Sequence, residues 1–240
     1  MKRIFFLPLL LLLLFLAACN IFGERVHGNG NIKSEARQTG HFSSVDVNSN
    51  INLHLKQDAN WSVRVETDEN LLQYIEVSEN NDLLRVSVRN NFNLDPSRTI
   101  DVFVTAPEFK RLNGSGASEI VSDTPITGAG PMDIDISGAS SITLELKAPE
   151  VKAVLSGASK ATLRGQTKDA IIHGSGASEF HCFELMAENS DVDVSGASNA
   201  DVFASVNLKA EASGASNIRY KGKPSVSSNT SGAGNVASAN

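Results

Sequence analysis

Apolar and polar residues alternate on both sides of a short motif, Ser-Gly-Ala, that recurs through the second half of the chain. Just before one copy of the motif, Ile134 and Ile136 alternate with Asp133 and Asp135, and the other copies follow the same pattern with small or apolar residues. Five positions after the first serine, the residue is again apolar, as at Ile142. Side chains of a β-strand point alternately to its two faces, so one strand enters each motif and another leaves it. Each of these strands has one buried face.

The motif returns with a period near 20 residues, which is typical of a stacked repeat architecture. Its first serines are Ser115, Ser137, Ser156, Ser175, Ser195, Ser213 and Ser231. Glycine supplies a tight corner between two strands, and alanine and serine let neighbouring corners approach closely. Equivalent strands of successive repeats then lie parallel and about 4.8 Å apart. The sequence predicts an all-β fold, a single-stranded parallel β-helix (β-solenoid) with one rung per Ser-Gly-Ala-Ser repeat across residues 111–240.

Residues 41–110 are rich in alternating strand patterns but lack the motif. They could form wider rungs of the same solenoid or an antiparallel cap over its first rung, and we favour one continuous body, 41–240. A short helical turn is expected around 68–74. At the other end, Lys221, Lys223 and Pro224 precede a Ser/Asn-rich last rung, which is the usual protection of an exposed strand edge.

The first 18 residues have the features of an export signal, with Lys2 and Arg3 before an apolar run that is too short to remain as a membrane span. The run ends in Leu16-Ala17-Ala18-Cys19, which resembles the bacterial lipobox. By that resemblance, 1–18 is a lipoprotein signal peptide, and Cys19 is the first mature residue and carries acyl chains such as palmitate. Residues 20–40 are short on apolar residues and contain four glycines, so we interpret 19–40 as a lipidated Cys and tether, in which Val26 and Ile32 could begin strand pairing. An ordinary signal peptide with an incidental cysteine is the alternative. Asn20 after the cysteine favours the outer membrane by analogy with lipoprotein sorting.

The formal net charge of −6, without a basic stripe, argues against nucleic acid as a partner. No later apolar run is long enough to span a membrane. If Cys19 is lipidated, Cys182 is the one remaining cysteine, and no intramolecular disulfide can form. Its position in the repeat is apolar in neighbouring rungs, so we interpret Cys182 as a small buried side chain rather than a nucleophile.

The serines and the outward carboxylates of the repeats each have two interpretations, one functional and one structural. The motif serines occur in seven equivalent copies, whereas a nucleophile needs one activated serine beside a base, so we expect a hydroxyl ladder bonded to backbone. Outward carboxylates such as Asp193 and Glu211 fall in adjacent rungs and could bind Ca²⁺, but Lys152 follows Asp133 and Lys209 follows Asp191, which favours a solvated, partly paired face.

Histidines and aromatic residues offer two more candidates. His173 and His181 flank one corner, but two histidines without a third ligand are not a zinc site. Phe183 and Phe203 share one position of the repeat, where they could stack on a sugar ring or fill the corner of their rungs. The sequence thus assigns no catalytic residue, no metal site and no cofactor.

The serine-rich repeats, the alternating strands and the lipoprotein-like start resemble one family, described as "putative auto-transporter adhesin, head GIN domain". Asn50-Ile51-Asn52 occupies the place of that family's Gly-Ile-Asn, and asparagine, like glycine, tolerates a left-handed backbone. The resemblance covers roughly residues 42–220. It implies a β-solenoid, an extracytoplasmic location, and no catalytic residues.

We therefore expect a non-enzymatic, lipid-anchored envelope protein with an adhesin-like binding scaffold. The expected partners are the membrane, through the lipid anchor, and a polysaccharide or a host or matrix protein, but not nucleic acid. Two alternatives stay open: a polysaccharide-active β-helix enzyme, and a structural envelope protein without a dedicated ligand. The sequence leaves the ligand and the oligomeric state undetermined.

Overall fold

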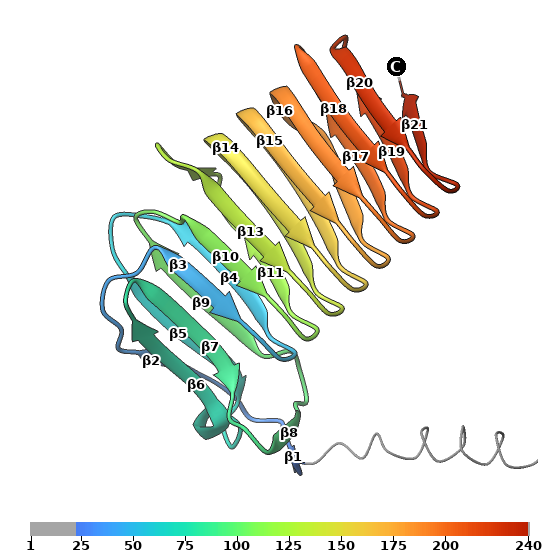
Figure 1. Cartoon of the computed structure of the whole chain (residues 1–240). Helices are drawn as coiled ribbons and strands as arrows, with labels where there is room; N and C mark the ends of the chain where they lie inside the picture. The colour runs from blue at the N-terminus through green and yellow to red at the C-terminus, as the bar shows by residue number, and fades with distance from the viewer. Residues whose placement is uncertain (1–22, 240) are drawn as a thin grey trace, which may run out of the picture.

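The computed structural model describes residues 23–239, and in this range the chain forms one elongated β-solenoid (Figure 1). Two sheets run along its axis and enclose the core between them. The incoming sheet holds the strands that enter the serine–glycine corners, and the outgoing sheet holds those that leave them. The predicted fold class is confirmed.

Residues 111–239 form the regular rungs, in which equivalent strands pair in parallel from one repeat to the next. Three strands, β14, β15 and β16, are long enough to leave one corner on the outgoing sheet, bend, and enter the next corner on the incoming sheet. The strands are β10 (Arg111–Gly114), β11 (Glu119–Ser122), β12 (Ile126–Thr127), β13 (Met132–Ile136), β14 (Ser141–Leu155), β15 (Lys160–Gly174), β16 (Glu179–Val194), β17 (Asn199–Phe203), β18 (Asn207–Ala212), β19 (Asn217–Lys221), β20 (Ser225–Thr230) and β21 (Asn235–Ser238).

The N-terminal part contains both arrangements that the sequence left open. Strands β3 and β7 continue the incoming sheet in parallel, and β4 and β9 continue the outgoing sheet, whereas β6, β5 and β2 close the two sheets with antiparallel pairs. The elements are β1 (Glu24–His27), β2 (Ile32–Arg37), β3 (Ser44–Val47), β4 (Asn52–Gln57), β5 (Ser62–Asp68), the 3-10 helix η1 (Leu72–Tyr74), β6 (Ile75–Asn80), β7 (Leu83–Val88), β8 (Phe92–Asp95) and β9 (Asp101–Ala106). The expected helical turn is therefore present.

Strands β1 and β2 lie inside the range 19–40 that the sequence assigns to a tether. Strand β1 pairs in parallel with β8, and β2 pairs with β5. The tether prediction is therefore wrong for 24–27 and 32–37, where the alternative of strand pairing at Val26 and Ile32 is confirmed. The alternating pattern is weak there because β2 is an edge strand with no fully buried residue.

The corners stack in register because glycine takes a left-handed backbone at the same position of every rung. Gly157 and Gly176 have φ of 77° and 78°, and the N–H of Ala177 donates to the Gly157 carbonyl at 2.8 Å. The same bond links each corner to the next along the axis. In the first corner this position is Ser49 (φ 77°), which precedes Asn50, so the left-handed residue there is a serine rather than a glycine.

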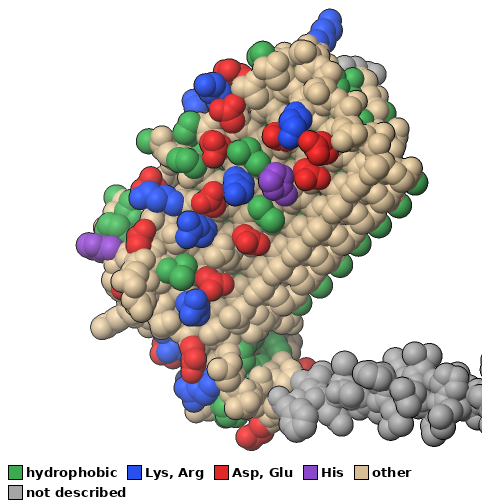
Figure 2. Space-filling model, in the orientation of Figure 1, with side chains coloured by type: hydrophobic (Ala, Val, Ile, Leu, Met, Phe, Trp, Pro, Cys, Tyr) green, Lys and Arg blue, Asp and Glu red, His purple; other side chains and the backbone are tan. Residues whose placement is uncertain are grey.

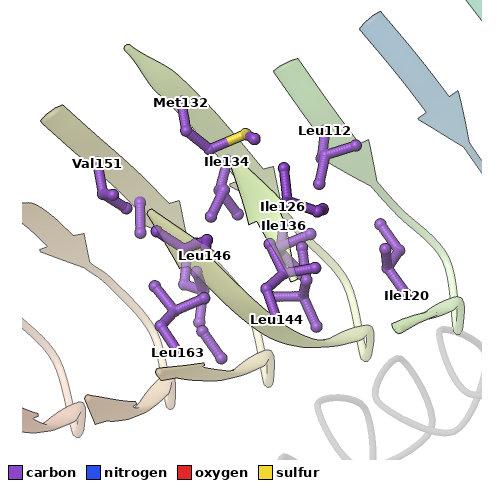
Figure 3. Close-up of a cluster of buried hydrophobic side chains, with 14 of the residues drawn as sticks. Leu112, Ile120, Ile126, Met132, Ile134, Ile136, Leu144, Leu146, Val151 and Leu163 are labelled. Atoms are coloured by element: carbon purple, nitrogen blue, oxygen red, sulfur yellow. The ribbon is translucent and has the colours of Figure 1, made fainter. Parts of the chain in front are cut away.

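The core is a continuous column of aliphatic side chains contributed by both sheets. In one section, Leu112, Ile134 and Ile136 of the incoming strands face Ile120 and Leu144 of the outgoing strands (Figure 3). Each of these side chains is essentially fully buried, and burying one stabilises the fold by about 2 kcal/mol. The apolar positions of the alternating sequence pattern are thus the ones whose side chains face the core.

The two ends of the solenoid are finished differently. At the C-terminal end, β20 and β21 each pair on one side only, with β18 and β19. Inward positions that hold Ala210 and Ala212 in the preceding rung hold Ser228 and Thr230 in the last one. All six residues of β20 are exposed. Polar side chains therefore face the water that reaches this open end.

At the N-terminal end, a buried carboxylate joins three loops. Asp68 is fully buried and accepts hydrogen bonds from the backbone N–H groups of Gly30 (2.6 Å) and Ser97 (2.8 Å) and from the Ser97 hydroxyl (2.7 Å). Burial acts to raise its pKa, but these donors outweigh that effect and hold the pKa of Asp68 below its ordinary value. Asp68 thereby ties the cap strands to the loop before β9.

Candidate functional site

Second serines of the motif donate hydrogen bonds to backbone carbonyls along the corner, as seen at Ser118, Ser159, Ser178 and Ser198. In each of the six motifs that have a second serine, this serine is buried, and Ser118 Oγ lies 2.8 Å from the Ser115 carbonyl and 2.7 Å from that of Ser49. The hydroxyl of a second serine also accepts a hydrogen bond from the backbone N–H of the equivalent serine in the preceding rung. For example, the N–H of Ser178 donates to Ser198 Oγ at 3.3 Å. The hydroxyl ladder predicted from the sequence is present, and it runs inside the corner.

Cys182 lies in the core on β16. Its side chain is 1% exposed, and burial raises the pKa of the thiol to about 12. A thiol that is neutral at physiological pH is a poor nucleophile. The structure places Cys182 among apolar side chains, as its position in the repeat predicts.

We expect Cys182 to be unreactive in the folded protein. In a Cys19→Ser variant, where Cys182 is the single thiol, iodoacetamide at pH 8 should leave it unmodified over hours, because both burial and the raised pKa oppose attack. Adding denaturing urea should allow complete labelling, measured by mass spectrometry. Labelling of the native protein as fast as a free cysteine peptide would contradict the buried position.

The outward face of the incoming sheet carries alternating charges (Figure 2). Lys209 lies 3.4 Å from Asp191 and 3.1 Å from Glu211, and these two carboxylates raise its pKa. In the same column as Lys152, Arg111 contacts Asp133 at 3.6 Å. The register places Asp193 beside Glu211, as predicted. Among residues 23–239, no three His, Cys, Asp or Glu side chains gather as a metal-binding group would require.

A depression on the described surface lies where the cap meets the first rungs. It encloses about 940 Å³ and is lined by three arginines, Arg37, Arg85 and Arg89, together with Ser, Asn and Gln side chains. All three arginines face carboxylates: Arg37 lies 2.8 Å from Glu35, Arg85 Nε is 3.1 Å from Asp46, and Arg89 Nε is 3.1 Å from Glu76. The sequence did not reveal this site, because most of its residues come from β2, β6 and β7, whose antiparallel pairings the repeat does not specify.

A narrower groove runs across four rungs of the outgoing sheet and encloses about 340 Å³. Its walls include His181, Asp201 and Arg219, and a row of asparagines, Asn199, Asn217 and Asn235. Both His173 and His181 are exposed, on opposite sides of their corner, as predicted. Phe183 and Phe203 are both half-buried on the outgoing sheet, near the end of the groove that Arg219 occupies.

The comparisons with known proteins agree with this architecture. The family model described as "Putative auto-transporter adhesin, head GIN domain" matches residues 41–224. Among curated protein sequences, none gives a significant match. In the described range, no helix has the length and apolar character that crossing a membrane requires.

Solved structures share the fold at low sequence identity. The chain is similar to a putative adhesin from Bacteroides fragilis NCTC 9343, with a TM-score of 0.83 and 16% identity over 89% of this chain and 99% of that one. It is also similar to a putative adhesin from Parabacteroides merdae ATCC 43184, with a TM-score of 0.73 and 20% identity over 91% of this chain and 100% of that one. For a putative lipid binding protein from Parabacteroides distasonis ATCC 8503, the TM-score is 0.72 and the identity is 18%, over 90% of this chain and 100% of that one. At these identities the likeness concerns the fold.

Proposed function

The chain belongs to the family described as "Putative auto-transporter adhesin, head GIN domain", and from that premise we propose that it is a non-enzymatic, lipid-anchored protein of the cell envelope. In this proposal, the flanks of the solenoid bind a polymeric or protein ligand, such as a polysaccharide or a matrix protein. The outer membrane is the expected site of the anchor.

One observation carries the proposal: outward side chains of successive rungs align in columns, as they do from β16 to β21. Because the strands are parallel and in register, Asn199, Asn217 and Asn235 fall one above another, and so do Asp191 and Lys209. Repeated, evenly spaced groups on an extended face suit a ligand that is itself extended. Solved proteins of the same fold are described as putative adhesins, which supports the same class of function.

A catalytic role would require a localised group of carboxylates or an activated nucleophile in a cleft. Second serines of the motif instead donate to backbone carbonyls, and Cys182 is buried with a raised pKa. Lys209 bridges two carboxylates on the incoming face, and Arg219 holds Asp201 on the outgoing face. These arrangements support a binding protein over a polysaccharide-active enzyme.

The proposed binding function can be tested with an array of glycans and matrix proteins. We expect the full-length protein, purified in mild detergent, to bind at least one class of polymer saturably and to leave it unmodified. The bound polymer should be recovered at its original chain length by mass spectrometry or gel filtration. Shortening of any polysaccharide would favour the enzyme, and absence of binding to every class would favour a structural role.

The anchor prediction falls on Cys19, which lies outside the described residues. Replacing Cys19 by serine should move the protein from the membrane fraction to the soluble fraction, since each acyl CH₂ buried in a bilayer contributes about 0.8 kcal/mol to anchoring. The measurement is an immunoblot of fractionated cells. A Cys19→Ser protein that still sediments with membranes would exclude lipidation as the means of attachment.

A further inference from the structure

We propose that the groove on the outgoing sheet, with Phe183 and Lys221 at its edge, is a binding site for a linear polysaccharide that bears carboxylate groups. This inference rests on the proposed binding function and assigns it a site and a ligand class. It is drawn from four features of the described residues: a break in the repeat, a row of amides, a fixed ion pair and a cation without a carboxylate partner.

The regular register of the repeats is broken at Phe183. Strands β15 and β16 pair one to one up to Thr162 and His181, but the pairing resumes with Arg164 opposite Glu184, so β16 holds one extra residue. A β-bulge re-aims a side chain out of the regular pattern and is over-represented next to functional sites. Here the extra residue is a phenylalanine, which is half-buried and packs against Arg219 and Lys221.

The row of amides gives the groove a regular set of hydrogen-bonding groups. Asn199, Asn217 and Asn235 occupy the same position of three successive rungs, and Asn217 Nδ2 donates to Asn199 Oδ1 at 3.0 Å. The rungs repeat at about 4.8 Å, close to the length of one pyranose ring in an extended chain. Amide groups at this spacing can meet hydroxyls of consecutive sugar residues.

The floor of the groove is held by a rigid ion pair. Arg219 bonds bidentately to Asp201, with Nε–Oδ1 at 2.7 Å and a terminal nitrogen to Oδ2 at 2.6 Å. Asp201 is 9% exposed, and Arg219 is fixed in one orientation by this fork. Such preorganised polar groups orient a ligand without a further cost in side-chain ordering.

One end of the groove carries the Glu179 carboxylate, 3.5 Å from His181 Nε2, whereas the charge at the edge near Lys221 favours an acidic ligand. Lys221 Nζ lies 4.6 Å from the Phe183 ring centroid, and among the described residues no carboxylate is within ion-pair distance of it. Arg219 lies on the same ring at 5.6 Å. Within 212–239, the chain holds Arg219, Lys221 and Lys223 but no Asp or Glu. This end is therefore basic within an acidic protein, and Lys221 is free to meet a sugar carboxylate.

The test uses the full-length protein in mild detergent and a hexamer of galacturonic acid, with its methyl-esterified form as the uncharged match. Binding is measured by calorimetry at low salt. We expect the acidic hexamer to bind and the ester to bind at least about tenfold more weakly, because one charge-assisted contact is worth about that factor. Lys221→Glu should weaken binding of the acid by about tenfold or more. Lys147→Glu, which makes the same charge change at an exposed position on β14 away from the groove, should leave it unchanged.

The outcomes separate this site from the broader function. Equal loss in Lys221→Glu and Lys147→Glu, or no loss in either, would overturn the assigned site. If the acidic hexamer does not bind while the array identifies another ligand, the ligand class is wrong and the binding function stands.

Deleting Phe183 should restore the regular register and reduce binding of the acid with no loss of folding by circular dichroism. Full binding after this deletion would exclude the bulge from the site.

Discussion

A Gly176→Val variant should lose about 3–5 kcal/mol of folding stability, and the stack should separate at this rung. Gly176 has φ of 78°, a conformation that a β-branched residue resists, and a Cβ there would lie 2.7 Å from the Gly157 carbonyl oxygen. That oxygen accepts the inter-rung bond from Ala177. The clash therefore falls on the hydrogen bonds that hold the corners in register. Urea unfolding followed by circular dichroism measures the effect.

Gly130 supplies the matched control. It lies outside the corner column, its φ is not in the left-handed region, and nothing lies within 4 Å of a Cβ built on it. Gly130→Ala should therefore change the unfolding free energy by less than about 0.5 kcal/mol. Equal changes in the unfolding free energy for the two variants would mean that the stacking of the corners does not require a glycine at position 176.

A Phe180→Ala variant should lose about 3–5 kcal/mol, because the largest side chain of this section of the core would leave a cavity. Phe180 is 1% exposed and lies between Ala161 and Ala200, its partners in the neighbouring rungs. The small neighbours cannot fill the space. The free energy of unfolding in urea tests this value.

Gly174 makes the packing argument specific. A Cβ on Gly174 would approach the Phe180 ring to 2.7 Å, so Gly174→Ala should destabilise the native protein by about 1–3 kcal/mol. In the Phe180→Ala background, the ring is gone and the same methyl group should cost less. We expect a coupling of at least about 1 kcal/mol in the double-mutant cycle. Additive effects would contradict the contact between these two positions.

The regular rungs could be predicted because every structural feature repeats locally. The glycine at 116 or 157 marks a corner, and the period then sets which strands pair, so the contact of Lys209 with Asp191 follows from counting residues. The burial of Cys182 follows in the same way. In a solenoid, each rung contacts only its neighbours, and sequence periodicity therefore carries most of the information on the fold.

The cap and the candidate sites could not be predicted, because they depend on pairings that the period does not specify. Strand β2 pairs antiparallel with β5, 30 residues away, and nothing in its alternation indicates that partner or direction. The left-handed residue of the first corner is Ser49, a residue type that gives no signal for it. The extra residue at Phe183 does lengthen its repeat, but the length alone does not say where along the rung the bulge falls.

The most direct test of the account is a set of distances between spin labels on the corner alanines. Ala117, Ala215 and Ala233 are exposed, and cysteines placed there can be labelled in a Cys19→Ser background where Cys182 stays buried. Corners in register predict a backbone separation of about 24 Å for the pair at 117 and 215, five rungs apart, and about 29 Å for 117 and 233. Distances that fail to grow by one rung spacing, as when successive corners lie at opposite ends of hairpins, would contradict the solenoid and with it the binding faces.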